Sequence, residues 1–413
     1  MTLTFDAARE RPLFWRLPEV RRSPVAFRTA LNVTADNWQG APLTVALPSG
    51  HGLRIAGAGH GPEVRLEVKD FNFIRRIIAS GDIGFAEGYA ARDWDTPDLA
   101  ALLVAFSENF DRLGGLMTGN PVVRALDHLR HLLRRNSRAG SRRNIHAHYD
   151  LGNSFYAAWL DPGMTYSSAL FREAGTSLEA AQREKYAALA RRIGIERGHK
   201  VLEVGCGWGG FAEFVGREIG AEVDAITISQ AQFDHASARI QAAGLADRVR
   251  IKLCDYRDLD GVYDRVASIE MFEAVGEPYW PTFFNKLEAV LKPGGLAGLQ
   301  IITIADDLFD GYRRRPDFIQ KYIFPGGMLP SQSRLREEVA SAGLVWRGLD
   351  GFGADYAQTL HQWTGRFESA WPKIQALGFD DQFRRLWRYY LGYCQAGFTT
   401  GRTDVVHLAL GKS

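Results

Sequence analysis

The sequence predicts an α/β fold with a parallel sheet in its second half and a small α+β module in front of it. From residue 200 onward, apolar strands alternate with helical segments, and this rhythm indicates right-handed βαβ units. The first of these strands runs straight into a glycine-rich turn. A chain of 413 residues is also too long for one ordinary core, so two domains are expected.

The front module is assigned to residues 1–125. Three stretches between residues 40 and 70 alternate apolar and polar residues, as strands do: LTVALPSG, HGLRIAGAG and EVRLEVKD. After Phe71 the pattern becomes helical, with IRRIIASG followed by PDLAALLVAFSENF. We therefore expect a small α+β module.

A basic linker is expected at residues 126–143. Six arginines and no acidic residue lie between residues 130 and 144. Two interpretations are open. The stretch is either a solvated basic segment, or an anchor for anionic lipid headgroups, where each clustered Lys or Arg gains about 1 kcal/mol near the surface.

The second domain is assigned to residues 144–413. A helix, LEAAQREKYAALARRI, precedes the strand KVLEVGC, and the strands EVDAITI, VRIKLCD, DRVASIE and LAGLQIITI follow. VWRGLDGF and DVVHLAL are expected to close the sheet. A segment at about 305–330, rich in aromatic and basic residues, interrupts the pattern and is interpreted as an insertion.

Composition excludes several classes of protein. No apolar run reaches the roughly 18 residues that a membrane span needs, and the N-terminus lacks the basic start and apolar stretch of a signal peptide. The net charge of +2 gives no case for nucleic acid. Three cysteines cannot form a disulfide framework. We expect a cytoplasmic protein without a metal site.

The decapeptide VLEVGCGWGG at residues 201–210 is the most informative motif. Its glycines allow a sharp turn and a close approach to a ligand, and the following helix offers free N–H groups. The order E-x-G-C-G-x-G differs from the dinucleotide fingerprint, and there is no Walker lysine. It resembles motif I of class I methyltransferases, which implies S-adenosylmethionine beside Gly205, Cys206 and Gly207. A tight turn without a ligand is the alternative.

The next two strands end in further candidate cofactor contacts. The second strand ends in ITISQ, where methyltransferases usually carry an acidic residue that holds the ribose. Ser229 and Gln232 also have the spacing of a capping box, so Gln232 is either a helix cap or a cofactor contact. Asp255 and Tyr256 follow the third strand, where an adenine contact is expected.

Several other motifs make the resemblance more specific. They are similar to those of the cyclopropane-fatty-acyl-phospholipid synthase family, which includes the mycolic acid cyclopropane synthases. The resemblance covers residues 144–413 and implies a Rossmann-like class I methyltransferase fold with a seven-stranded mixed sheet. The front module more weakly resembles the sterol-carrier-like domain of longer members, a lipid-binding type. The motifs are HYDLGN (148–153), MTYSS (164–168), DYRDL (255–259), MFEAVG (271–276), KYIFPGG (321–327) and FGADY (352–356).

The resemblance implies methyl transfer from S-adenosylmethionine to the double bond of an unsaturated phospholipid acyl chain. A minority of the aromatic side chains in the insertion are then expected to line an acyl tunnel, with its arginines near lipid phosphate. The positions that match cofactor contacts are Tyr166, Ser167, Gly205, Cys206, Gly207, Thr227, Ile228, Gln232, Asp255 and Tyr256.

A bicarbonate ion is the second ligand that the resemblance implies. Glu273 matches the acidic residue of the family's bicarbonate site, Tyr356 its tyrosine and Ile302 a source of backbone contacts. Tyr356 can also be read as core packing, and Glu273 as a surface glutamate. Cys394 matches a family cysteine often proposed as catalytic, but a buried, unreactive thiol explains it better, because the reaction needs no covalent enzyme intermediate.

Three positions depart from the family pattern and leave the fate of the intermediate open. Ser168 replaces the site cysteine, Gln300 replaces the site histidine, and Ala274 stands where a histidine is usual after Glu273. An amide, unlike a histidine, cannot relay a proton. We expect the bicarbonate site to survive in altered form, with the proton reaching Glu273 through the anion.

The chemistry requires a dry site, because an alkene attacks the sulfonium methyl and leaves a carbocation. Loss of a proton from the new methyl closes a cyclopropane, whereas loss from a neighbouring carbon gives a branched chain. The sequence favours the cyclopropane slightly over a methyl- or methylene-branched chain.

The expected partner is a phospholipid, reached by peripheral attachment at the inner face of the membrane, and a homodimer is expected. Two other functions stay open. A small-molecule N- or O-methyltransferase would share the glycine turn but would not need Tyr356 near Glu273. A non-catalytic lipid-binding homologue would explain Ser168 and Gln300 as lost site residues, although the intact glycine turn argues against it.

Overall fold

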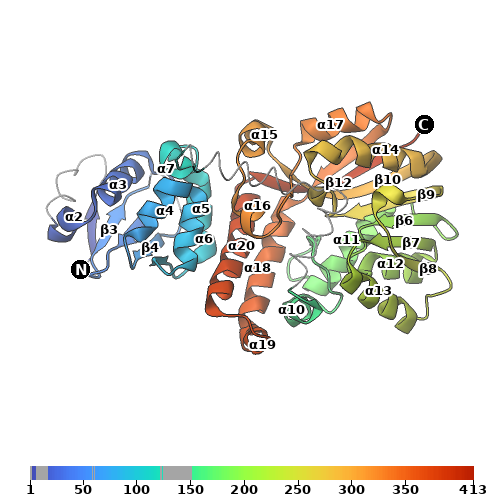
Figure 1. The fold of residues 1–413 in the computed structure, drawn as a ribbon, viewed down its shortest axis with the longest axis horizontal. Coiled ribbons are helices and arrows are strands. Elements are labelled where there is room, and N and C mark those ends of the chain that lie inside the picture. Colours follow the sequence, from blue (N-terminus) through green and yellow to red (C-terminus); the bar gives the residue numbers. More distant parts are fainter. Residues whose placement is uncertain (1, 6–16, 58, 60, 121–122, 124–150) are drawn as a thin grey trace. The chain divides into compact units, whose positions relative to one another are not determined.

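The computed structural model describes residues 2–5, 17–57, 59, 61–120, 123 and 151–413 (Figure 1). The chain forms two compact units. The first comprises Met1–Arg130, Arg315–Ile319 and Gly378–Thr400, and the second comprises His131–Arg314, Gln320–Leu377 and Gly401–Ser413. The predicted basic linker at residues 126–143 and the start of the HYDLGN motif lie outside the described residues.

The first unit contains the small sheet that the alternating stretches predict. Its five strands have the order β1-β3-β2-β4-β5. β2 and β3 form an antiparallel pair, whereas β1 pairs in parallel with β3 and β2 in parallel with β4. The strands are β1 (Thr2–Phe5), β2 (Leu43–Ala46), β3 (Gly52–Ile55), β4 (Val64–Val68) and β5 (Trp94–Asp95).

Both predicted helical segments of this unit are helices. The Asp98 side chain caps the later one by accepting a hydrogen bond from the Ala101 N–H. In the earlier one, Phe73, Ile74 and Ile77 are buried on one face. The helices of the N-terminal segment are α2 (Pro18–Arg22), α3 (Val25–Asn37), α4 (Asn72–Ser80), α5 (Asp82–Ala90), α6 (Leu99–Asn109) and α7 (Gly114–Thr118).

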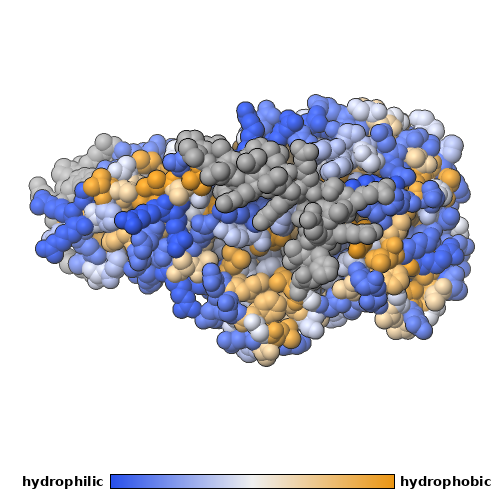
Figure 2. All heavy atoms as spheres, in the orientation of Figure 1, coloured by the Kyte–Doolittle hydropathy of each residue, from blue (hydrophilic) through white to orange (hydrophobic). Residues whose placement is uncertain are grey.

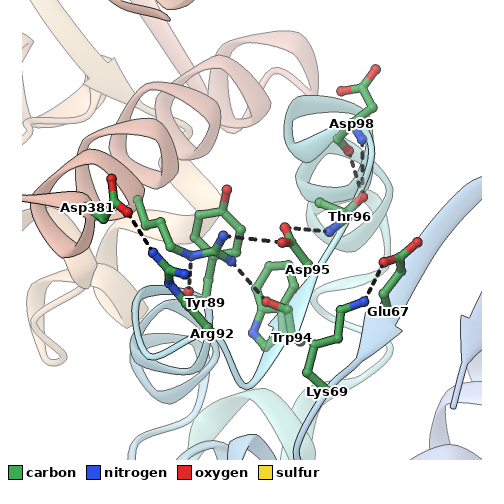
Figure 3. Close-up of polar contacts among 10 residues, drawn as sticks. Glu67, Lys69, Tyr89, Arg92, Trp94, Asp95, Thr96, Asp98 and Asp381 are labelled. Carbon is green, nitrogen blue, oxygen red and sulfur yellow. Dashed lines mark hydrogen bonds and ion pairs between the residues drawn. The ribbon is translucent and has the colours of Figure 1, made fainter. Parts of the chain in front are cut away.

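The first unit also contains α20 (Asp381–Thr399), which the sequence places with the second domain. The Arg385 guanidinium lies 3.8 Å from the centre of the Tyr89 ring and donates hydrogen bonds to the carbonyls of Tyr89 (2.7 Å) and Trp94 (3.1 Å). Arg92 and Asp381 form an ion pair at 2.9 Å (Figure 3). These contacts, together with the packing of α20 on α6, explain why the helix groups with the N-terminal module.

The second unit contains a seven-stranded mixed sheet with the order β11-β12-β10-β9-β6-β7-β8, as the resemblance implies. β12 runs antiparallel to β10 and β11, and the other pairs are parallel. The strands are β6 (Lys200–Val204), β7 (Glu222–Thr227), β8 (Val249–Leu253), β9 (Tyr263–Ile269), β10 (Leu291–Ile304), β11 (Val345–Gly351) and β12 (Thr403–Gly411).

Helices cover this sheet and bury two apolar clusters. One cluster includes Phe283 and Val339, from α14 and α17, and the other includes Phe211 and Ile240, from α12 and α13. The helices of the second unit are α10 (Asn153–Trp159), α11 (Leu178–Arg192), α12 (Gly210–Phe214), a π-helix (Val215–Ile219), α13 (Gln230–Ala242), α14 (Trp280–Val290), α15 (Asp306–Arg313), α17 (Gln332–Ser341), α18 (Gly353–Ser369) and α19 (Trp371–Ala376). A further helix, α16 (Phe318–Tyr322), has residues in both units.

The strand order creates a switch point between β6 and β9. The chain leaves β6 toward β7 and β8 and then returns to the other side of β6 with β9 (Figure 1). In open α/β sheets, ligands bind outside the carboxyl ends of the strands at such a point. The glycine turn follows β6 and Glu270 follows β9, so both lie at this edge.

The surface of the described part is mixed. Figure 2 shows apolar residues gathered in the lower part of the view, and Leu377 directly after α19 is an exposed apolar side chain. Among the described residues, no helix combines the length and the apolar character that crossing a membrane requires.

Candidate active site

The glycine turn after β6 is held by the neighbouring strand and leaves room for a ligand. The N–H groups of Gly205 and Cys206 both donate to the Ile226 carbonyl, at 3.0 and 2.9 Å. Gly207 has a φ of +51°, and a Cβ placed there would meet nothing within 4 Å. A Cβ on Gly205 would lie 2.5 Å from the Met271 side chain, so the turn can approach the next loop only with glycine there.

Glu203 lies at the end of β6 with one unsatisfied oxygen. The side chain is buried, and its Oε2 has no hydrogen-bond partner among the described residues. Burial raises the pKa of Glu203 to about 8. A buried carboxyl group beside an open glycine turn suits a ligand with a cationic group, such as the amino group of S-adenosylmethionine. The residues therefore fit the predicted cofactor.

The candidate cofactor residues at the ends of the next strands form hydrogen bonds or ion pairs with neighbouring residues. The Ser229 hydroxyl accepts from the Gln232 N–H at 3.4 Å, so the predicted helix cap is present. The Gln232 side chain does not complete a capping box, because its Oε1 accepts from the Thr227 hydroxyl at 2.8 Å. Asp255 makes a bidentate ion pair with Arg257, at 2.8 and 2.6 Å.

The segment that carries Tyr166 and Ser167 packs on buried groups. The Tyr166 ring lies 5.4 Å from that of Trp363. The Ser167 hydroxyl accepts a hydrogen bond from Lys185 at 2.6 Å. Lys185 is fully buried, and this burial lowers the pKa of Lys185 to about 8, against the opposing effect of Glu270, Asp161 and Glu203.

Glu270 is the centre of the site. Its Oε1 accepts from the Ser168 N–H at 2.8 Å and from the Gln300 amide at 2.7 Å, and its Oε2 accepts from the Tyr356 hydroxyl at 2.7 Å. Ser168, Gln300 and Tyr356 come from three separate parts of the chain and were all predicted to surround a bicarbonate ion. In the structure, a carboxylate of the protein itself lies where their donors converge.

The backbone of Glu270 has an unusual conformation. Its φ is +48°, in the left-handed region that side chains other than glycine rarely adopt. Its N–H donates to the Gln300 carbonyl at 2.8 Å, which anchors the residue to β10. Strain of this kind, about 1–3 kcal/mol, persists where surrounding contacts over-determine it, often at functional sites.

Glu273 lies nearby in a different environment. Its Oε1 accepts from the Ile302 N–H at 2.6 Å, so the expected backbone contact of Ile302 is made to Glu273. Its Oε2 is buried without a hydrogen-bond partner in the described part of the chain. Burial, with the negative charge of Glu270, raises the pKa of Glu273 to about 8.

The two carboxyl groups therefore lie in different electrostatic environments. Burial raises the pKa of Glu270 as well, but the charge of Lys185 and hydrogen bonds from Tyr356, Ser168 and Gln300 oppose that rise. Glu273 has only backbone donors. Glu270 therefore has more groups that stabilise its anionic form than Glu273 has. Where two neighbouring carboxyl groups differ in this way, the one with more hydrogen-bond donors is the better candidate for a catalytic carboxylate.

Sequence reasoning missed Glu270 and His407. An acidic residue directly after an apolar strand, at the edge where the glycine turn lies, was a signal that could have identified Glu270. His407 lies on β12 and contacts Gln300 at 2.9 Å. Cys394 is on α20 in the first unit, whereas the other predicted catalytic residues are in the second.

Part of the predicted insertion also belongs to the first unit, through Arg315–Ile319. Two of its arginines have partners within the second unit. Arg313 pairs with Glu277 at 2.9 Å, and Arg314 donates to the Asp310 carbonyl at 2.8 Å. Their expected role near lipid phosphate stays a prediction.

Comparison with known proteins identifies the family. Residues 136–408 match the family described as mycolic acid cyclopropane synthetase. The chain belongs to this family. It is a methyltransferase that depends on S-adenosylmethionine, from a family of fatty acid methyltransferases and cyclopropane synthases.

Two relatives span most of the chain. It is 40% identical over 351 residues to the tuberculostearic acid methyltransferase UfaA1 of Mycobacterium tuberculosis, which covers 81% of this chain and 80% of that protein. It is 33% identical over 382 residues to the cyclopropane-fatty-acyl-phospholipid synthase of Escherichia coli strain K12. That alignment covers 89% of this chain and 92% of the Escherichia coli protein.

Solved structures confirm the fold. The cyclopropane synthase MmaA2 from Mycobacterium tuberculosis gives a TM-score of 0.62 at 28% identity and covers 66% of this chain and 98% of its own. The mycolic acid cyclopropane synthase CmaA1, solved with SAH and CTAB, gives the same values.

Proposed function

We propose that this chain methylates the double bond of unsaturated phospholipid acyl chains and uses Glu270 as the base that removes a proton from the intermediate. The observation that carries the proposal is the convergence of three donors, from Ser168, Gln300 and Tyr356, on the Glu270 carboxylate. In this proposal the carboxylate takes the place that the resemblance gives to bicarbonate. The chain then needs no free anion.

The cofactor, when bound, supplies an electrophilic methyl group. The glycine turn and Glu203 are proposed to hold it, together with Tyr166, Ser167, Thr227, Gln232, Asp255 and Tyr256. Glu270 is half-buried and Lys185 is fully buried, which limits the access of water to the base. In such a site, electrostatic interactions are stronger than in water, so the negative charge of Glu270 stabilises a nearby carbocation.

The product follows from the strength of this base. One alkene carbon gains the methyl group through the two π electrons, and the positive charge first lies on the other alkene carbon. Three donated hydrogen bonds make Glu270 a weaker base than an equally buried carboxylate without them would be. In this proposal the slower proton transfer gives the cation time for a hydride shift to the methyl-bearing carbon, where the charge is tertiary. Loss of a proton from the methyl group to Glu270 then leaves a methylene branch. We therefore propose a methylene-branched chain, ahead of the cyclopropane that the sequence slightly favours.

The name of the 40% identical relative, a tuberculostearic acid methyltransferase, supports transfer to a fatty acyl chain. That of the Escherichia coli relative supports a phospholipid substrate. Neither supports a small soluble acceptor. A non-catalytic lipid binder is disfavoured because both the open turn at Gly207 and the Glu270 cluster are intact.

Lipid analysis tests the proposal. Purified protein is incubated with vesicles of monounsaturated phospholipid and cofactor whose methyl group carries three deuterium atoms. Both a ring and a methylene branch retain two deuterium atoms, whereas loss of a proton from a neighbouring carbon retains three. Proton spectra of unlabelled product then separate a ring, with methylene protons at unusually high field, from a methylene branch, with alkene protons. Ring products alone would overturn the methylene assignment, and no labelled lipid would overturn the proposed substrate.

We also propose that the protein works at the membrane surface as a homodimer. A double bond in the middle of an acyl chain must be withdrawn from the bilayer, and the arginines of the basic linker can attract anionic headgroups. Binding to anionic vesicles should weaken as salt rises, because exposed charges are screened within about 10 Å at 0.1 M. Equal binding to neutral vesicles would contradict the role of the arginines, and light scattering gives the oligomeric state.

A further inference from the structure

His407 lies directly opposite Gln300 in the sheet. The two residues are antiparallel partners on β12 and β10, and both side chains are buried. The His407 Nε2 is 2.9 Å from the Gln300 Oε1. The ring of Phe352 packs edge-on against the imidazole with 4.7 Å between ring centres. His407 is therefore held in place and contacts Gln300, which in turn contacts Glu270.

The other contacts of Gln300 determine which way its amide faces. Its Nε2 lies 2.7 Å from the Glu270 Oε1 and 3.4 Å from the Ser168 carbonyl oxygen. Both neighbours are acceptors, so the amide NH₂ must face them. The amide oxygen then faces His407 and can only accept. It follows that His407 carries its proton on Nε2 and donates it to Gln300.

We propose that His407 is a positioning residue that locks the Gln300 amide with its NH₂ group toward Glu270. The proposal rests on the function proposed above, in which Glu270 is the base. A glutamine side chain can rotate its amide end by half a turn at little intrinsic cost. Without a donor behind it, the buried Gln300 oxygen is left unsatisfied and the amide is held from one side only, so its hydrogen bond to Glu270 weakens.

His407 suits this role because it stays neutral. Burial, together with the positive charges of Lys185, Arg192 and Arg172, lowers the pKa of His407 to about 3. A neutral imidazole with its proton on Nε2 donates to Gln300 at every pH at which the protein is expected to work. The site thus contains a histidine that fixes a hydrogen bond without titrating.

The consequence for Glu270 has a definite sign. Gln300 donates to the ionised form of Glu270, which lowers the pKa of that carboxyl group, as do Tyr356, Ser168 and Lys185. Burial and the charge of Glu270 raise the pKa of the neighbouring Glu273 to about 8. Loss of the Gln300 donor therefore raises the pKa of Glu270. Because only the ionised carboxylate can accept a proton, the acidic limb of the kcat profile must move to higher pH.

The test compares His407→Phe with His407→Gln in the full chain on phospholipid vesicles. Phenylalanine keeps the ring and its packing on Phe352 but cannot donate, whereas glutamine keeps a donor. We expect His407→Phe to lower kcat by about 10–100-fold, the range found when an outer hydrogen-bond partner of a metal ligand is removed. We expect its acidic limb to move up by about one pH unit. Cofactor affinity, measured by calorimetry, should not change, and His407→Gln should recover much of the rate.

Gln300→Leu provides a second route if His407→Phe does not fold. It should reproduce the shift of the acidic limb, and adding His407→Phe to it should produce no further shift. Wild-type rate and pH profile in His407→Phe would overturn the proposal, as would equal loss in His407→Phe and His407→Gln. Glu270→Gln separates the two proposals, since full activity in that variant would overturn the role of Glu270 itself.

Discussion

Replacing Glu270 with glycine should convert an enzyme with a built-in base into one that needs an added anion. Glycine adopts a φ of +48° readily, so the substitution relieves about 1–2 kcal/mol of backbone strain. It also leaves three donors, from Ser168, Gln300 and Tyr356, without their acceptor. Each buried donor left unsatisfied costs about 1–3 kcal/mol. The net result is a protein less stable by a few kcal/mol, with a cavity that matches a small carboxylate.

The rate should fall by about 10²–10⁴-fold, as expected for loss of a general base. Bicarbonate or formate should restore part of it, and the same anions should raise the melting temperature in proportion to the logarithm of their concentration. The assay measures labelled methyl groups in vesicle lipid, in buffers freed of carbon dioxide, with chloride at equal ionic strength as the control.

Glu270→Ala is the matched variant for this test. It opens the same space but keeps a Cβ at a left-handed position, so it should be about 1 kcal/mol less stable than Glu270→Gly while showing the same rescue. Adding Tyr356→Phe to Glu270→Gly removes one donor and should weaken the rescue. Near wild-type activity of Glu270→Gly without added anion would refute the reasoning, because the proton would then leave by another route.

Three further predictions concern the cofactor, the second carboxyl group and the first unit. Gly207→Val should abolish cofactor binding in calorimetry, because its side chain would fill open space beside the turn, and unchanged affinity in a folded variant would exclude that role for the turn. Glu273 has a folded pKa of about 8, above its ordinary value of 4.5, so the folded state binds more protons and stability should fall as pH rises between these values. In denaturant titrations, Glu273→Gln should remove that part of the pH dependence of stability. Glu273→Gln should also lose far less activity than Glu270→Gln. If Glu273→Gln lost more activity than Glu270→Gln, Glu273 would be favoured as the proton acceptor. Arg385→Ala should lower the unfolding free energy by about 2–4 kcal/mol, since it loses a ring contact and several hydrogen bonds, and an unchanged melting curve would argue against its role in holding α20.

Local patterns made much of the fold predictable. The strand before Gly205, the turn itself and the alternation of strands and helices depend on neighbouring residues, and the resemblance supplied the seven-stranded sheet. The grouping of α20 with the first unit could not be predicted in this way. It depends on Arg385 meeting Tyr89, which lies 296 positions earlier in the chain.

The sequence predicted several residues of the site but not Glu270, the carboxylate on which their donors converge. Ser168, Gln300 and Tyr356 were recognised from motifs, and the structure brings them together. Glu270 was missed because its role appears only when three distant segments aim donors at one carboxylate. His407 was missed for the same reason, since its pairing with Gln300 depends on the register of β10 and β12.

The first unit combines an N-terminal segment with a segment near the C-terminus, and this affects how it can fold during synthesis. A ribosome produces the N-terminal module first, but Tyr89, Trp94 and the apolar face of α6 receive their partner only when α20 has been synthesised. At about 5–20 residues per second, the 296 positions between Tyr89 and Arg385 take roughly 15–60 s. During that interval the nascent module exposes apolar surface that the finished protein buries. A chaperone that binds such surface would therefore meet this protein early in its synthesis and release it only near the end.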